Sequence, residues 1–75
     1  GRCCESGDII QEHVSLPASV GRGDTVAVCT TGAYNYAMAS NYNRIPRAPI
    51  VMLKDGKSYV AVRRETFADM CACDL

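Results

Sequence analysis

The sequence predicts a mainly β fold, part of a β-barrel, with one or two short helices. Three features predict it. Asp55-Gly56 lies between two apolar runs, residues 25–30 are nearly all β-branched, and glycines or prolines separate the runs. An Asp-Gly pair between such runs is the strongest short-range hairpin signal, and short β-branched runs between turn residues are typical of strands. With 75 residues, the chain is one small domain at most.

The first half of the chain predicts two strands and a short helical stretch. Residues 8–16 alternate imperfectly between apolar and polar side chains, which predicts an exposed strand. Residues 25–30 predict the clearest buried strand, and the two glycines of residues 20–24 predict a tight turn before it. Gly32 predicts a sharp turn after that strand. Small residues at helical spacing in 33–40 predict one or two helical turns.

The second half predicts a turn, a hairpin and a short helix. Residues 41–43 form a turn cluster, and the prolines of 44–49 keep that stretch extended. Residues 50–54 and 57–63 flank the Asp-Gly pair. A two-residue turn then sets Lys54 opposite Lys57, Met52 opposite Tyr59 and Val51 opposite Val60.

The last predicted element is a short helix that begins after Thr66. Thr66 is a suitable N-cap, with Asp69 three residues further on. Phe67, Met70 and Cys71 then share one face of the helix.

Composition excludes several classes of protein. Eight basic and eight acidic residues give a net charge of zero, whereas nucleic-acid and membrane-surface proteins usually have a basic excess. No apolar run approaches the ~20 residues that span a bilayer. The chain has no initiator Met and starts within a motif, so we expect a fragment of a longer protein with no nucleic-acid or membrane partner.

Five cysteines, an odd number, do not pair into a disulfide framework. Cys3-Cys4 and Cys71-Ala72-Cys73 also lack the C-x₂₋₄-C spacing of zinc sites. We therefore expect free thiols, no bound metal and a cytoplasmic location.

Three groups of side chains are candidates for chemistry. Cys4 and Glu5 lie in the loop of residues 3–8, although a polar turn with two inert cysteines is favoured on residue types alone. Tyr34, behind a glycine, is able to donate to a phosphate or carboxylate, or is a half-buried packing residue. Arg44 and Arg47 beside two asparagines either grip an anion or belong to a solvated loop.

Four motifs in order resemble the diaminopimelate decarboxylases. They are Cys4-Glu5-Ser6-Gly7-Asp8, Gly32-Ala33-Tyr34, residues 38–47 (MASNYNRIPR) and Arg63-Arg64-Glu65-Thr66. The family belongs with ornithine decarboxylase to the pyridoxal-phosphate enzymes of the alanine-racemase-like fold (fold type III). Glu5 and Ser6 favour the diaminopimelate enzymes, because ornithine decarboxylases typically have aspartate after the cysteine.

The resemblance implies that residues 1–75 are the C-terminal part of a Greek-key-type β-barrel domain. The N-terminal (β/α)₈ barrel, which carries the cofactor-bound lysine and the phosphate loop, is absent from this chain. The family works as a homodimer in which the cysteine loop reaches the neighbour's active site. We therefore expect this chain to be inactive alone and to self-associate through unpaired strand edges.

The resemblance also implies roles for three residues. Cys4 matches the family's proton donor. A thiol suits this role, because it can give and regain a proton near neutrality. Glu5 matches the carboxylate that binds the distal amino group of diaminopimelate. Tyr34 matches the tyrosine of the substrate site that reaches the phosphate of pyridoxal 5'-phosphate. Asn41, Asn43 and Arg47 are expected to hold the barrel and the interface together.

The expected activity is conversion of meso-2,6-diaminopimelate to L-lysine and CO2, a lyase reaction. Two alternatives stay open: a related decarboxylase that uses ornithine or carboxynorspermidine, and a non-catalytic small β domain that binds a partner. Two departures from the family pattern are Cys3, where an apolar residue is usual, and Asn35, where glycine is common.

Overall fold

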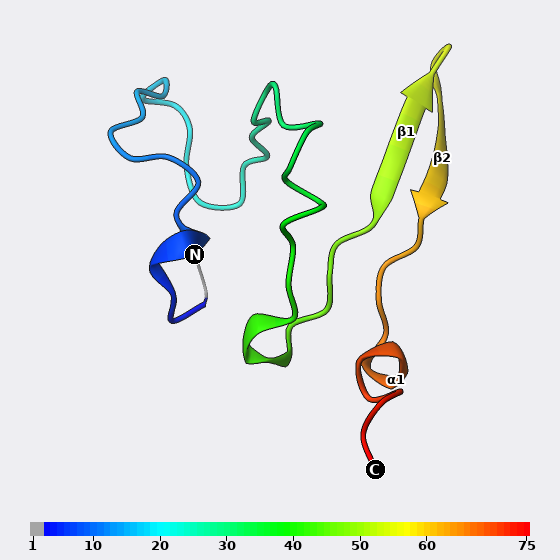
Figure 1. Cartoon of the computed structure of the whole chain (residues 1–75). Coiled ribbons are helices and arrows are strands. Elements are labelled where there is room, and N and C mark those ends of the chain that lie inside the picture. The colour runs from blue at the N-terminus through cyan, green and yellow to red at the C-terminus, as the bar shows by residue number, and fades with distance from the viewer. Residues whose placement is uncertain (1–2) are drawn as a thin grey trace.

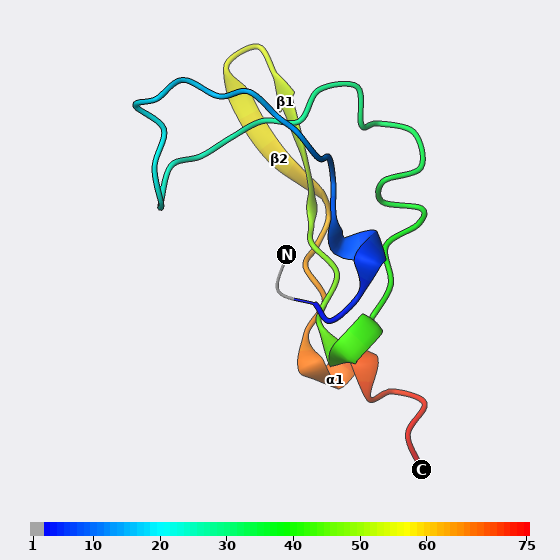
Figure 2. The ribbon, with the colours of Figure 1, turned by 90° about the vertical axis from the view of Figure 1, so that its left-hand side faces the viewer.

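The computed structural model describes residues 3–75, which form one hairpin, one short α-helix and two 3-10 turns (Figure 1). Their order along the chain is η1 (Ser6–Asp8), η2 (Tyr42–Arg44), β1 (Ile50–Lys54), β2 (Lys57–Val62) and α1 (Phe67–Met70). In Figures 1 and 2 the turn of the hairpin lies at one end of the molecule, and η2 and α1 lie at the other.

The hairpin confirms the prediction from Asp55-Gly56. β1 and β2 pair antiparallel, and the partners are those expected: Lys54 with Lys57, Met52 with Tyr59 and Val51 with Val60. Asp55 has φ 51° and Gly56 has φ 71°. Positive φ at both central positions matches the twist of the flanking strands, which is why this dipeptide closes hairpins.

The capped helix is also confirmed. The Thr66 side chain accepts a hydrogen bond from the backbone N–H of Asp69, and the Asp69 carboxylate accepts one from the Thr66 N–H. This reciprocal capping box satisfies two backbone donors that the first turn would otherwise leave free.

The two strands predicted in the first half of the chain are wrong. Residues 9–16 have no regular structure, and His13 has φ 55°, which interrupts an extended run. Residues 25–28 are in no strand, and Val26 is 61% exposed. A strand needs a neighbour that bonds to its N–H and C=O groups. The two segments line one pocket together, but no backbone hydrogen bond of the described residues joins them.

The helical turns predicted for residues 33–40 are present only as hydrogen-bonded turns. The Met38 N–H donates to the Tyr34 carbonyl at 2.7 Å, but Tyr34 itself has φ 72°, which ends any helix there. Gly32 lies in a turn, as expected, but the left-handed residues around it are Thr30 and Tyr34. Gly21 and Asp24 close the predicted tight turn.

No side chain of residues 3–75 is fully buried, so the described chain has no core. Its radius of gyration is 15.3 Å, against about 11 Å for a compact domain of this length. Figure 2 shows why: residues 9–40 run in wide loops to either side of the hairpin. The described residues form one sheet of two strands, and they form no barrel. None of the described helices is long and apolar enough to cross a bilayer.

Candidate functional site

The cysteine loop is closed by its own hydrogen bonds. The Glu5 carboxylate accepts from the Gly7 N–H and the Ser6 hydroxyl, both at 3.1 Å, and so caps η1. The Cys3 N–H donates to the Asp8 carboxylate at 3.0 Å. The Gly7 N–H, followed by the Ser6 hydroxyl, holds the pKa of the Glu5 carboxyl below its ordinary value. Glu5 is therefore a fixed anion at the surface of the loop.

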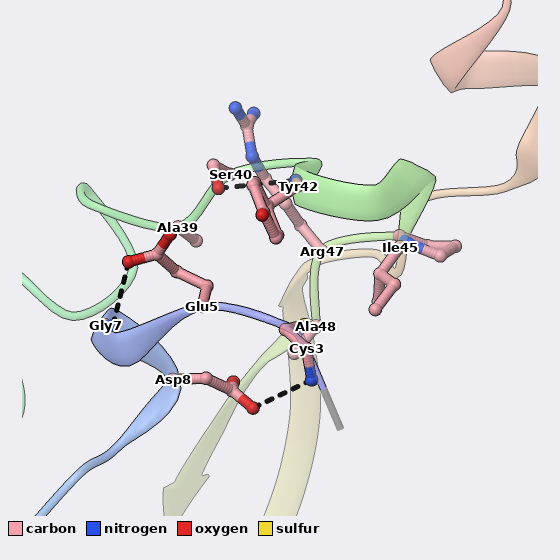
Figure 3. Close-up of a pocket in the computed structure, with 11 residues that line it drawn as sticks. Cys3, Glu5, Gly7, Asp8, Ala39, Ser40, Tyr42, Ile45, Arg47 and Ala48 are labelled. Carbon is pink, nitrogen blue, oxygen red and sulfur yellow. Dashed lines mark hydrogen bonds between the residues drawn. The ribbon is translucent and has the colours of Figure 1, made fainter. Parts of the chain in front are cut away.

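This loop forms one wall of a cleft of about 280 Å³ (Figure 3). Cys3, Glu5 and Asp8 line it from the loop, and Tyr42 and Arg47 line it from the segment around η2. Figure 3 shows Glu5 and Tyr42 at the same cleft although they come from opposite halves of the chain. The cleft thus combines carboxylates, a phenol and a guanidinium.

Cys4 is exposed but is not among the residues that line the cleft. Its backbone carbonyl accepts a hydrogen bond from the Tyr42 hydroxyl at 3.0 Å, across 38 positions of sequence. Of the two candidates in the loop, the structure therefore places Glu5 in the cleft and Cys4 at its edge.

Tyr34 lies in an adjoining hollow of about 340 Å³, which it lines together with Gly7, Met38 and Ala39. Gly7 and Ala39 also line the cleft, so the two depressions share a rim. Tyr34 is 75% exposed, and no group of residues 3–75 hydrogen-bonds to its hydroxyl.

Glu65 is the residue that sequence reasoning missed. Its carboxylate accepts from the Asn41 amide and, at 2.8 Å, from the Arg47 N–H, and so ties the end of the hairpin to the start of η2. The Arg47 N–H, then the Asn41 amide, lowers the pKa of the Glu65 carboxyl. The sequence signals no such pairing. The expectation that Asn41 and Arg47 hold the barrel and the interface together stays a prediction.

Arg44 is occupied by an ion pair. Its guanidinium donates to both carboxylate oxygens of Asp74, at 3.1 and 3.2 Å, and to the Met70 carbonyl. This bidentate pair raises the pKa of Arg44 and lowers that of Asp74. Of the two alternatives for Arg44, neither a free anion site nor a purely solvated loop describes it.

All five cysteines are free thiols. Within residues 3–75, no three His, Cys, Asp or Glu side chains are grouped so that they could hold a metal ion.

Several curated proteins match this chain along its length. It is 49% identical over all 75 residues to the diaminopimelate decarboxylase of Bacillus subtilis (strain 168). It is 53% identical over 70 residues to that of Actinosynnema pretiosum subsp. auranticum, and 46% over 74 residues to that of Staphylococcus aureus (strain COL). These matches cover 93–100% of this chain. No protein-family model and no solved structure matches it.

The matches first define a class: the chain is related to amino-acid decarboxylases, which are lyases. Its particular family, by sequence, is that of the diaminopimelate decarboxylases, which confirms the resemblance drawn from the four motifs. The chain spans only 17% of the length of the Bacillus subtilis protein and 16–18% of the other two.

Proposed function

We propose that this chain is the C-terminal β-domain segment of an enzyme that converts meso-2,6-diaminopimelate to L-lysine and CO2. One observation carries the proposal: the match to the diaminopimelate decarboxylase of Bacillus subtilis, at 49% identity, extends over the whole chain. The chain supplies side chains to an active site whose barrel lies elsewhere in the protein, and it is inactive alone.

The three candidate residues suit pyridoxal 5'-phosphate chemistry. When bound, this cofactor supplies the electron sink, and the protein supplies positioning and protons. Tyr34 offers an exposed phenol whose hydroxyl bonds to no described residue. Such a hydroxyl suits donation of a hydrogen bond to a phosphate oxygen. Cys4 offers an exposed thiol that donates a proton to the carbon from which CO2 has left.

Glu5 selects the substrate in this proposal. Diaminopimelate carries a second amino group at its far end, and a carboxylate kept ionised is the natural partner for that ammonium. The lowered pKa of Glu5 and its place in the cleft support the assignment. The Gly7 and Ser6 hydrogen bonds use one carboxylate oxygen, Oε1, and leave the other available.

We further propose that the open first half of the chain completes a β-barrel in the parent protein. Val26 and Val28 are 61% and 47% exposed, although their segment has the composition of a buried strand. Strands from the rest of the protein would cover them. In this proposal the whole enzyme is a cytoplasmic homodimer, with the cysteine loop near the neighbour's active site. The isolated chain self-associates through its unpaired strand edges. The lack of a core argues against a free-standing binding domain.

The test uses the full-length protein that contains this segment. CO2 release is measured with meso-diaminopimelate, ornithine and carboxynorspermidine, and we expect turnover of the first alone. Cys4→Ala should lower turnover about a hundredfold, the scale of general acid catalysis, and leave the cofactor absorbance unchanged. Cys73→Ala, which removes another exposed thiol, is the matched control. Equal turnover in both variants would exclude Cys4 as the proton donor. Turnover of ornithine would show that diaminopimelate is not the only substrate and would overturn that assignment.

A further inference from the structure

We propose that Tyr42 is a positioning residue, whose hydroxyl holds the loop that carries Cys4 and Glu5. The inference rests on the proposed function and adds a residue that the sequence motifs did not single out. The Tyr42 hydroxyl donates to the Cys4 carbonyl at 3.0 Å. It is the hydrogen bond that joins Cys4 to the second half of the chain.

The loop is closed by its own hydrogen bonds, so one external bond is expected to place it. The Glu5–Gly7 and Cys3–Asp8 hydrogen bonds close the loop on itself. A closed loop keeps its internal shape but still needs a contact that sets its position on the scaffold. The bond from Tyr42 reaches the backbone between the two functional side chains and therefore positions both.

Tyr42 can do this because η2 is itself fixed. Asn41 is bonded to Glu65 on one side of η2, and Arg44 to Asp74 on the other. Asn43 and Arg44 have φ 57° and 56°, and two consecutive non-glycine residues in this region persist only where surrounding contacts impose them. The strained turn is held between two cross-links, and its phenol points at the loop.

Tyr42 is 45% exposed, so packing holds it only in part. Phenylalanine would preserve the ring and remove only the hydrogen bond. Tyr36 is a matched control, because it is 41% exposed and no group of residues 3–75 hydrogen-bonds to its hydroxyl.

Steady-state kinetics of the full-length enzyme give the first test. Tyr42→Phe should lower kcat for CO2 release from meso-diaminopimelate about fivefold, as expected for one lost hydrogen bond. The KM should rise as well, because the same loop carries Glu5, the proposed partner of the substrate's distal ammonium group. Tyr36→Phe should match the wild type. An unchanged kcat in Tyr42→Phe would overturn the proposal.

A second readout does not need activity. Iodoacetamide alkylation, resolved by peptide mass spectrometry, reports the exposure and mobility of each thiol. In Tyr42→Phe, iodoacetamide should alkylate Cys4 about threefold faster than in the wild type, and the rate at Cys73 should be unchanged. Asn41→Ala keeps the phenol but releases η2 from Glu65, and it should give a smaller increase at Cys4.

The two readouts separate the two proposals. Faster alkylation of Cys4 alone, in a protein that does not decarboxylate diaminopimelate, would refute the proposed function and support the role of Tyr42. An unchanged rate at Cys4, or equal acceleration at Cys4 and Cys73, would refute the role of Tyr42 whatever the activity.

Discussion

The two halves of this chain contain similar amounts of apolar sequence but differ in structure. Residues 41–75 hold the hairpin, the α-helix and cross-links from Asn41 to Glu65 and from Arg44 to Asp74. Within residues 9–40, every described hydrogen bond joins residues no more than four positions apart. One half is organised by its own contacts, and the other consists of turns linked by extended chain.

The difference shows which signals act without partners. The Asp-Gly turn and the Thr66 cap each depend on about four consecutive residues, so they form without contacts from distant parts of the protein. A β-branched run such as residues 25–30 only makes a surface that suits a sheet. It becomes a strand when neighbours bond to both of its edges. We therefore propose that segments of the first half become strands only when the rest of the protein supplies their neighbours.

The largest predicted effect would show this dependence directly. In the isolated chain, the amides of residues 25–28 should exchange hydrogen at nearly the rate of an unstructured peptide. In the full-length protein they should be protected about a hundredfold or more, since core strands open only with large parts of the domain. Hydrogen exchange with peptide-level mass spectrometry measures both.

The amides of β2 serve as the internal control, because the hairpin pairs within the chain. They should show some protection in both proteins. If residues 25–28 exchanged equally fast in the full-length protein, the contrast between the halves would belong to the native enzyme, and the barrel proposal would fail.

The same contrast explains how much could be predicted. The sequence predicted the hairpin register and the capping box correctly, because each depends on residues close in sequence. It predicted strands at 8–16 and 25–30 incorrectly, because an apolar pattern does not show whether a neighbouring strand is present to bond to it. It predicted the turn at Gly32 correctly, but not that Tyr34 takes the left-handed conformation, because nothing in a tyrosine's chemistry indicates that.

The candidate site divides in the same way. Cys4, Glu5 and Tyr34 were found because the family resemblance implies a role for each. Glu65 and Tyr42 also lie in the matching motifs, but they act through hydrogen bonds that span 24 and 38 positions, and no local pattern reports such pairs. A tyrosine in a turn has many surface neighbours, so only the fold shows that its partner is the Cys4 carbonyl.

A second prediction tests whether the hairpin depends on its turn alone. Gly56→Val places a β-branched residue at φ 71°, which costs about 1–2 kcal/mol, or roughly a tenfold loss of hairpin population. Gly21→Val is the control, because its φ is not left-handed and the space around its Cβ is open. NMR cross-strand NOEs between Met52 and Tyr59 in the isolated chain measure the population. Equal NOEs in both variants would mean that side-chain pairs, not the turn, set the register.

The smallest predicted effect concerns the Glu65 cross-link and the acidity of its carboxyl group. The Arg47 N–H and the Asn41 amide bind the ionised form, so the folded pKa lies below the ordinary value of 4.5. A group with a depressed folded pKa stabilises the fold at pH above 4.5, and this contribution is lost as the pH falls through the folded pKa. In the isolated chain, the NMR shift of the Arg47 amide proton should therefore be constant above pH 5 and should move upfield with a midpoint below 4.5. Glu65→Gln should abolish the titration. A midpoint at or above 4.5 would show that the cross-link does not form without the rest of the protein, and the second half would then depend on partners as much as the first.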